Sequence, residues 1–349
     1  MPGFITHYLI GDIVSSALAD SKAGMVISNN RHMFNMGTQG PDFLFYYTSL
    51  RPSNSARGRE IGNMLHDAKT GEFIASLIKY AAGCNKVSEC EALWAYIMGY
   101  VCHYSLDCHT HPYIYCRAGF DSNDKSYVSY PKYPKYKYTF YHRTFETWID
   151  FLMLQRIKQL KPSELNPASL ITLGKDNARA AGAMYECALQ ETYSVDFDAH
   201  RVTTAFKDIW ITVILLKDRY GIKKKLFAAI ENLLNISPAV SSMIHPVTGE
   251  QYRNLDFLNL DKKPWFLPWD QEALHTESFP ELFSKAAEEA VRICRLTERW
   301  VQAGSQLNMP AVVYETGSRS FSTGLDCRDK KEFRYFDCIF DNSHFEDRP

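Results

Sequence analysis

The chain has 349 residues, long enough for one large globular unit or two domains. Apolar residues make up 46% and charged residues 23%, a composition that excludes a disordered chain. The formal net charge is −1, so the charge balance gives no support for general nucleic-acid binding, which depends on a strongly basic face. We therefore expect a folded protein without a nucleic-acid partner.

The N-terminus and the cysteines add two expectations. No apolar run reaches the roughly 18 residues of a membrane span, and the first residues lack the pattern of a secretory signal. These features predict a cytoplasmic location. The nine cysteines include no CxxC pair of zinc-finger spacing, so we expect reduced thiols in the core and no sulfur ligands for a metal.

Most of the chain shows apolar residues at three- and four-residue intervals, which predicts helices. Ser55, Ser88 and Asn166 are N-cap candidates, and Pro167 falls at a first helical position. Strand-like alternation is limited to two short pieces, at 126–130 and 311–315. The expected fold class is all-α, a multi-helix bundle. The predicted helices span residues 5–20, 57–82, 88–116, 139–160, 167–193, 198–218, 221–235 and 277–304.

Three segments do not read as helices. Residues 119–138 are rich in Pro, Tyr and Lys and form either a solvated connector or a rim whose lysines attract an anionic head group. Residues 236–276 contain several Pro and Trp and are expected to wrap irregularly over the helices, and the tail 305–349 has little periodicity. We expect a metal-binding catalytic region over 1–160. A mostly helical extension over 161–349 is either separate from it or continuous with it.

The helix predicted over 88–116 carries three polar groups in a line, because His103, Asp107 and His111 are spaced four residues apart. Four residues of α-helix change the side-chain direction by only about 40° and rise about 6 Å. The three groups therefore share one stripe of a helix that is otherwise apolar. Burying them is costly unless a charged group satisfies them, and a divalent metal ion does so directly.

Other candidate ligands accompany this stripe. His142 and Glu146 repeat the four-residue spacing on the helix predicted over 139–160, and the sequence also offers His7, Asp42 and His66. Nitrogen and oxygen ligands without sulfur favour Zn²⁺, with Mn²⁺ and Fe²⁺ as alternatives. The set is too large for one tetrahedral ion and suits two or three close ions. Paired metals stabilise the oxygens of a phosphoryl centre, so phosphoester hydrolysis is the expected chemistry.

The order and spacing of these residues resemble the zinc-dependent phospholipase C family over about residues 1–160. The shared pattern is an early His, an Asp in a Pro-Asp turn, a His, an HxxxD pair, a further His and an HxxxE pair. Here it corresponds to His7, Asp42, His66, His103 with Asp107, His111, and His142 with Glu146. The resemblance implies a helical bundle like that of the phospholipases C and single-strand nucleases. It also implies a phospholipid or other phosphodiester as substrate, with transient contact to a membrane surface.

The resemblance further implies how two or three zinc ions are held. Asp42, His66, His103 and Asp107 would hold one ion, with Asp42 as the general base. His111, His142 and Glu146 would hold a second, and His7 and Asp107 would contribute to a third. Secreted members also use a processed N-terminal amine on the third ion. Because this chain starts Met-Pro-Gly-Phe, we expect that ion to be weakly held, differently ligated or absent.

Two other functions remain as alternatives. Single-strand nucleases use a similar zinc cluster, so a nuclease or nucleotide phosphoesterase is the second hypothesis, and a non-enzymatic, metal-stabilised binding protein is the third.

The sequence leaves the oligomeric state open. Asp67, next to His66 in the sequence, is interpreted either as a surface charge or as a residue that orients His66. The remaining histidines are expected to be structural: His32, His109 (which points about 200° away from Asp107), His200, His245, His275 and His344.

Overall fold

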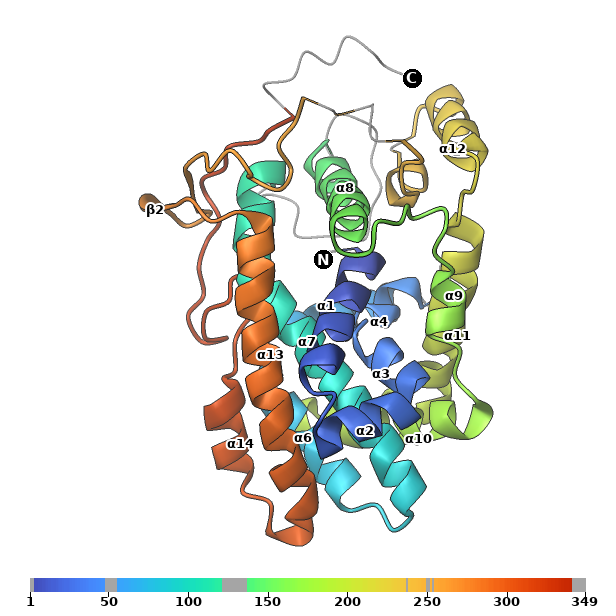
Figure 1. Cartoon of the computed structure of the whole chain (residues 1–349), viewed down its shortest axis with the longest axis vertical. Coiled ribbons are helices and arrows are strands. Elements are labelled where there is room, and N and C mark those ends of the chain that lie inside the picture. The colour runs from blue at the N-terminus through green and yellow to red at the C-terminus, as the bar shows by residue number, and fades with distance from the viewer. Residues whose placement is uncertain are drawn as a thin grey trace.

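The computed structural model describes residues 3–47, 55–120, 137–236, 238–248, 252 and 254–340. Within these residues the chain forms fourteen α-helices and one two-stranded antiparallel sheet, which confirms the predicted all-α class (Figure 1). No helix in the described part is long and apolar enough to span a bilayer.

The first eight helices run from the N-terminus to residue 158. They are α1 (Phe4–Ala17), α2 (Lys22–Asn29), α3 (Arg31–Gly37), α4 (Phe43–Tyr46), α5 (Ser55–Asp67), α6 (Thr70–Ala82), α7 (Val87–Ala118) and α8 (Lys137–Lys158).

The later elements include short 3₁₀ helices and the sheet. They are α9 (Pro167–Leu170), α10 (Lys175–Tyr193), α11 (Ala199–Leu216), α12 (Ile222–Leu233), η2 (Ser241–Met243), β1 (Trp265–Leu267), β2 (Asp270–His275), α13 (Phe279–Gln302), η3 (Gly304–Gln306) and α14 (Met309–Thr316).

Helix α7 is the centre of the fold. It is 32 residues long, and nearly every side chain from Ala92 to Ala118 is buried. A helix that is buried on all sides needs partners on all sides, and α7 is in contact with α1, α3, α6, α8, α10 and α13. Figure 1 shows it passing behind α1 through the middle of the bundle, with α13 along one side. The candidate ligands of α7 therefore lie in the core.

A close contact between two core helices, α3 and α7, is made possible by glycine. A Cβ added to Gly99 of α7 would lie 2.2 Å from the Phe34 carbonyl oxygen of α3. Across the same contact, a Cβ on Gly37 of α3 would lie 2.1 Å from the Tyr96 carbonyl oxygen of α7. Only residues without a side chain allow the two backbones to approach this closely. Helix α3 leads directly into the turn that carries Asp42, so this contact also positions the candidate site.

Several predicted boundaries were wrong. The single helix expected over 57–82 is divided into α5 and α6, because Lys69 adopts a left-handed conformation with φ of 49°. The helix expected over 167–193 is divided by an irregular stretch from Ile171 to Gly174. Helices α2 and α3 were not predicted. The predicted helices over 5–20, 88–116, 139–160, 198–218, 221–235 and 277–304 are confirmed to within a few residues.

The two strand predictions also need correction. Residues 311–315, expected as a strand-like piece, belong to α14, whose N-terminus is capped by the Asn308 side chain accepting from the Ala311 N–H. The second piece, 126–130, lies outside the described residues. The sheet instead forms inside 236–276, where Trp265 pairs with His275 across the strands and their rings stack at 4.6 Å.

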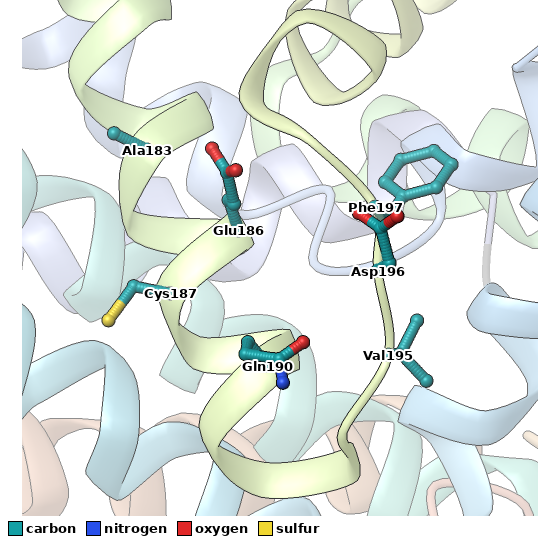
Figure 2. Close-up of a pocket in the computed structure, with 7 residues that line it drawn as sticks. All are labelled: Ala183, Glu186, Cys187, Gln190, Val195, Asp196 and Phe197. Carbon is teal, nitrogen blue, oxygen red and sulfur yellow. The ribbon is translucent and has the colours of Figure 1, made fainter.

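All nine cysteines are free, and the core location expected for them holds for some but not all. Six of them are buried, and Cys187 is exposed. Cys187 lies at a surface hollow between α10 and the extended segment that follows it (Figure 2). The hollow is lined by Ala183, Glu186, Cys187, Gln190, Val195, Asp196 and Phe197, none of which is a candidate metal ligand.

We expect Gly99→Ala to lower the free energy of unfolding by about 1–3 kcal/mol, because the added methyl group must push α3 and α7 apart. Gly83→Ala is the matched control, since its Cβ would meet no atom closer than 3.5 Å. Denaturant unfolding of both variants tests this. Equal stabilities of the two variants would contradict the close contact.

Candidate metal centre

The structure brings all eight candidate ligands together. They come from α1, from the turn before α4, and from α5, α7 and α8, and within each group the ligand atoms lie within 4.8 Å of one another. The first two groups share His103 and are His7 with His103 and Asp107, and Asp42 with His66 and His103; the third is His111 with His142 and Glu146.

Asp107 occupies the middle of the cluster. Its Oδ2 lies 3.1 Å from His103 Nε2 on the preceding turn of α7, and its Oδ1 lies 3.4 Å from His7 Nε2 of α1. His66 Nε2 of α5 is 4.0 Å from Oδ2. Two ligand atoms of a tetrahedral zinc ion are about 3.3 Å apart, given Zn–N and Zn–O bonds near 2 Å. The observed separations therefore suit ligands that share an ion.

Asp42 approaches the cluster from a tight turn. Gly40 has a φ of +50°, and a Cβ at this position would lie 2.3 Å from the His103 ring. Only glycine fits here, for both reasons. The turn places Asp42 Oδ1 3.1 Å from His66 Nε2 and 3.7 Å from His103 Nε2. The Pro-Asp turn thus joins the ligands of α5 to those of α7.

Backbone carbonyl oxygens orient three of the imidazoles. His66 Nδ1 lies 2.7 Å from the Gly62 oxygen, and His103 Nδ1 lies 3.2 Å from the Thr38 oxygen. His111 Nδ1 lies 2.8 Å from the oxygen of Phe321. A carbonyl oxygen only accepts, so each Nδ1 must donate its proton, and in the neutral ring the lone pair is then on Nε2. This arrangement is typical of histidines that bind a metal through Nε2.

Helix α8 supplies the remaining ligands and anchors α1. His142 Nε2 lies 2.7 Å from Glu146 Oε1, one helical turn away. One further turn along, the buried carboxylate of Asp150 accepts from the backbone N–H groups of Ile5 and Thr6 at 3.1 and 2.7 Å. This contact fixes the start of α1 and therefore the position of His7. Sequence analysis missed Asp150, although it continues the four-residue spacing of His142 and Glu146.

The chemistry of the buried atoms fits bound cations. Within the described residues, several atoms of the cluster are buried and take no hydrogen bond: both ring nitrogens of His7, both carboxylate oxygens of Asp107, and Nε2 of His103 and His111. Unsatisfied buried polar groups are costly, and a carboxylate among them more so. Divalent ions would satisfy the lone pairs among them, since a carboxylate oxygen and the unprotonated nitrogen of each ring can be zinc ligands.

Burial also controls the protonation of the imidazoles. It lowers the pKa of His7 well below its ordinary value, with repulsion from His103 adding to the effect, and it lowers the pKa of His111 to about 3. The pKa of His142 is lowered by burial as well. For His66 burial acts in the same direction, but the hydrogen bond to Asp42 and the negative charges of Asp42 and Asp107 together outweigh burial and raise the pKa. Most of the imidazoles are thus neutral near pH 7, which is the form that binds metal.

The C-terminal segment (residues 317–340) covers the cluster, which the sequence did not predict. The Phe321 ring is fully buried and packs against His66 and His103 at centroid distances of 4.9 and 5.6 Å. The Phe321 N–H donates to the His66 carbonyl oxygen, and its own oxygen accepts from His111. In Figure 1 the segment is the red trace that continues from α14 toward the top of the view. An irregular tail without periodicity gives no sequence signal for such a role.

Polar contacts hold the C-terminal segment in place. Ser320 Oγ donates to Asp67 Oδ1 at 2.6 Å. Asp67, the residue after His66, therefore holds the C-terminal segment over the cluster. Arg319 donates to Glu289 of α13 at 2.6 Å and to the Tyr104 hydroxyl at 3.1 Å. His109 also lies 3.2 Å from Glu289, outside the three ligand groups, as expected for a structural histidine.

Some sequence predictions fall on residues without a description. Most of the segment 119–138, considered as a rim of the site, lies outside the described residues, and so does His344. His245, expected to be structural, lies 2.7 Å from Asp150 Oδ2 and belongs to none of the three groups.

We expect removal of divalent metal by a chelator to lower the free energy of unfolding, because the buried lone pairs lose their partners. Zinc should restore about 4 kcal/mol when its free concentration is about 1,000-fold above Kd. Thermal unfolding with elemental analysis measures this, and Asp107→Asn should show a smaller zinc-dependent shift. A metal centre would be contradicted if the chelator leaves the midpoint of thermal unfolding unchanged and the purified protein contains no transition metal.

We expect Phe321→Ala to destabilise the protein by about 3–5 kcal/mol, since it leaves a cavity beside two imidazoles. It should also weaken zinc binding, because the His111 partner is no longer held in place. Tyr335→Ala, a more exposed aromatic of the same segment, is the control. If both variants unfold and bind zinc alike, the segment does not support the cluster.

Comparison with known proteins identifies the family. The zinc-dependent phospholipase C family model matches residues 6–203, which is more than half of the chain and includes all eight candidate ligands. Searches of curated proteins and of solved structures give no match. The helical fold, the three ligand groups and the family match agree with the resemblance found in the sequence. The chain belongs to the zinc-dependent phospholipase C family.

Proposed function

We propose that the protein is a metal-dependent phosphodiester hydrolase that cleaves a phospholipid in the manner of a phospholipase C. The observation that carries the proposal is the position of Asp42, a carboxylate 3.1 and 3.7 Å from Nε2 of His66 and His103, the nitrogen that each of these rings would offer to a metal. Family membership supports zinc as the metal. The donor set of imidazole and carboxylate groups supports it as well.

The ligand groups are consistent with two or three ions. His111, His142 and Glu146 share no residue with the other groups and would hold one ion. An imidazole nitrogen has a single lone pair, so His103 serves only one of the two groups that contain it. We assign it, together with Asp42, His66 and Asp107, to the second ion.

A third ion is the least well supplied with ligands. His7 Nε2 and Asp107 Oδ1 are 3.4 Å apart and would provide two of its ligands. A carboxylate has two oxygens, so Asp107 is able to serve both this ion and the second one. Elemental analysis of the purified protein would show whether it binds two or three ions.

Bound zinc would lower the pKa of water and neutralise charge developing on a phosphoryl centre. We assign the general base to Asp42. Asp107 is completely buried and surrounded by imidazoles, whereas Asp42 retains 5% exposure at the edge of the cluster. Of these two carboxylates, Asp42 is the one that a water molecule beside the substrate can reach. Its role is to accept the proton of that water as the water attacks phosphorus.

The substrate phosphate is proposed to approach from the side of α8. The side chains of His142 and Glu146 are 14% and 10% exposed, more than those of His7, His66, His103 or His111. The deeper ligands are closed off by α7 and by Phe321. A phosphodiester at the mouth of the cluster would thus meet His142 and Glu146 first.

We expect Asp42→Asn to reduce hydrolysis of a soluble chromogenic phosphodiester by about 10²- to 10⁴-fold, the usual contribution of a general base. His109→Gln is the control, because His109 contacts Glu289 on another side of α7 and should retain activity. Zinc content should be measured for both variants, so that a loss of metal is separated from a loss of the base.

The alternative functions predict different substrates. Faster turnover of short-chain phosphatidylcholine than of single-stranded DNA supports a phospholipase, and the reverse supports a nuclease or nucleotide phosphoesterase. If the wild type and Asp107→Asn have equal activity toward every phosphodiester, neither enzymatic function holds. A non-enzymatic, metal-stabilised binding protein would then be the better description.

A further inference from the structure

Helix α12 is attached to the protein by its polar side. Glu231 is its buried residue, and Glu231 Oε1 accepts from the backbone N–H groups of Val240 and Ser241 at 2.7 and 3.3 Å. One side of the helix is shared by Lys224 and Glu231, which are seven residues apart and differ in direction by about 20°. Lys224 Nζ donates to the carbonyl oxygens of Ser241 and Ile244. Charged side chains thus hold α12 against η2.

The opposite side of α12 is apolar and faces solvent. Ile222, Leu226, Ile230 and Leu233 follow one another at four- and three-residue intervals, so they share one face. They are 65%, 55%, 40% and 85% exposed. A surface helix normally buries its apolar face and exposes its polar one. Here the orientation is reversed, which leaves a continuous aliphatic face on the outside of the molecule.

The charges around this aliphatic face are positive. Lys223 and Lys225 are exposed, and they flank the face at about 100° and −60° from Ile222. The acidic residues between 214 and 236 are Asp218 and Glu231, and both are buried. The surface of α12 therefore combines aliphatic side chains with cations on both sides and presents no exposed carboxylate over 214–236.

We propose that α12 docks the protein on an anionic phospholipid membrane. The aliphatic side chains would enter the interface, while Lys223 and Lys225 extend their charged ends to lipid phosphates on either side. Charge complementarity favours this occupant over a protein groove or a second copy, since cations border the aliphatic face on both sides. The proposal goes beyond hydrolysis and does not depend on it.

The attachment of α12 also relates the docking face to the metal centre. The segment that receives α12 is bound to α8, since Arg143 donates to the Ala239 carbonyl oxygen and His245 contacts Asp150. Figure 1 shows α12 at the edge of the molecule, at the end where α8 begins. The most exposed ligands, His142 and Glu146, also lie on α8. Docking through α12 would hold this side of the protein near the lipid head groups.

Vesicle flotation of the full, zinc-loaded protein tests the proposal. We expect binding to phosphatidylcholine vesicles that contain about 30% phosphatidylserine, and weaker binding without the anionic lipid or at high salt. Lys223→Glu combined with Lys225→Glu should reduce binding by about 30-fold or more, since each cation contributes about fivefold near an anionic surface. Leu226→Ser, Ile230→Ser and Leu233→Ser together should reduce it by about 10-fold or more.

The control combines Val87→Ser with Tyr314→Ser, which removes apolar side chains that are 74% and 86% exposed elsewhere. It should bind vesicles as the wild type does. Hydrolysis of a soluble phosphodiester should be unchanged in all three variants, so a failure of docking is separable from a failure of catalysis.

Three results would overturn the proposal. The first is a wild type that does not float with anionic vesicles or floats equally with neutral ones. The second is undiminished binding by the two α12 variants. The third is a wild-type dimer in solution that the serine variant dissociates, because the aliphatic face would then join two copies of the chain.

Discussion

The burial of Asp107 is the constraint on which the rest of the structure depends. A carboxylate in the middle of a core helix loses its hydration, and most of the other faces of α7 are apolar. Imidazoles from α1, α5 and α7 lie within 3.1 to 4.0 Å of its oxygens, yet no hydrogen bond satisfies either oxygen within the described residues. Divalent cations would resolve this conflict, and they would require ligands from helices that are distant in sequence. Folding and metal binding are thus expected to be coupled.

The second requirement is that the imidazoles point inward with the correct nitrogen free. Three backbone carbonyl oxygens achieve this, at Thr38, Gly62 and Phe321. The first lies in the turn before α4 and the second one helical turn before His66. The third comes from the C-terminal segment, more than 200 residues after His111. The C-terminal extension therefore contributes directly to the geometry of ligands in the N-terminal region.

The polar and apolar parts of the molecule are arranged differently at its centre and at its edge. Helix α7 holds ionisable groups inside an apolar environment, where metal ions would compensate for their burial. Helix α12 is held by buried charges and leaves an aliphatic face outside. Both arrangements are costly for an isolated monomer in water, and a partner would explain each: zinc ions for the first and, as proposed above, a lipid surface for the second. The α12 face and the metal centre are connected in the structure, because α12 contacts η2 and η2 contacts α8, the helix that carries His142 and Glu146.

The sequence by itself determined the helical class and the eight candidate ligands. Spacings of four residues fix which side chains share a helix face, and this relation is local. His103, Asp107, His111, His142 and Glu146 were found in this way, while the order of His7, Asp42 and His66 came from the family resemblance. The division of the chain near residue 160 and the roles of the ligands remain predictions.

Only the tertiary structure decided which distant groups support the ligands. Neither the covering position of Phe321 nor the contact of Asp150 with α1 follows from periodicity, because both depend on contacts across more than 140 residues. The inverted orientation of α12 was hidden for a related reason. An amphipathic pattern shows that two faces differ, but not which one meets the protein, and hydrogen bonds to residues 240–244 decided this.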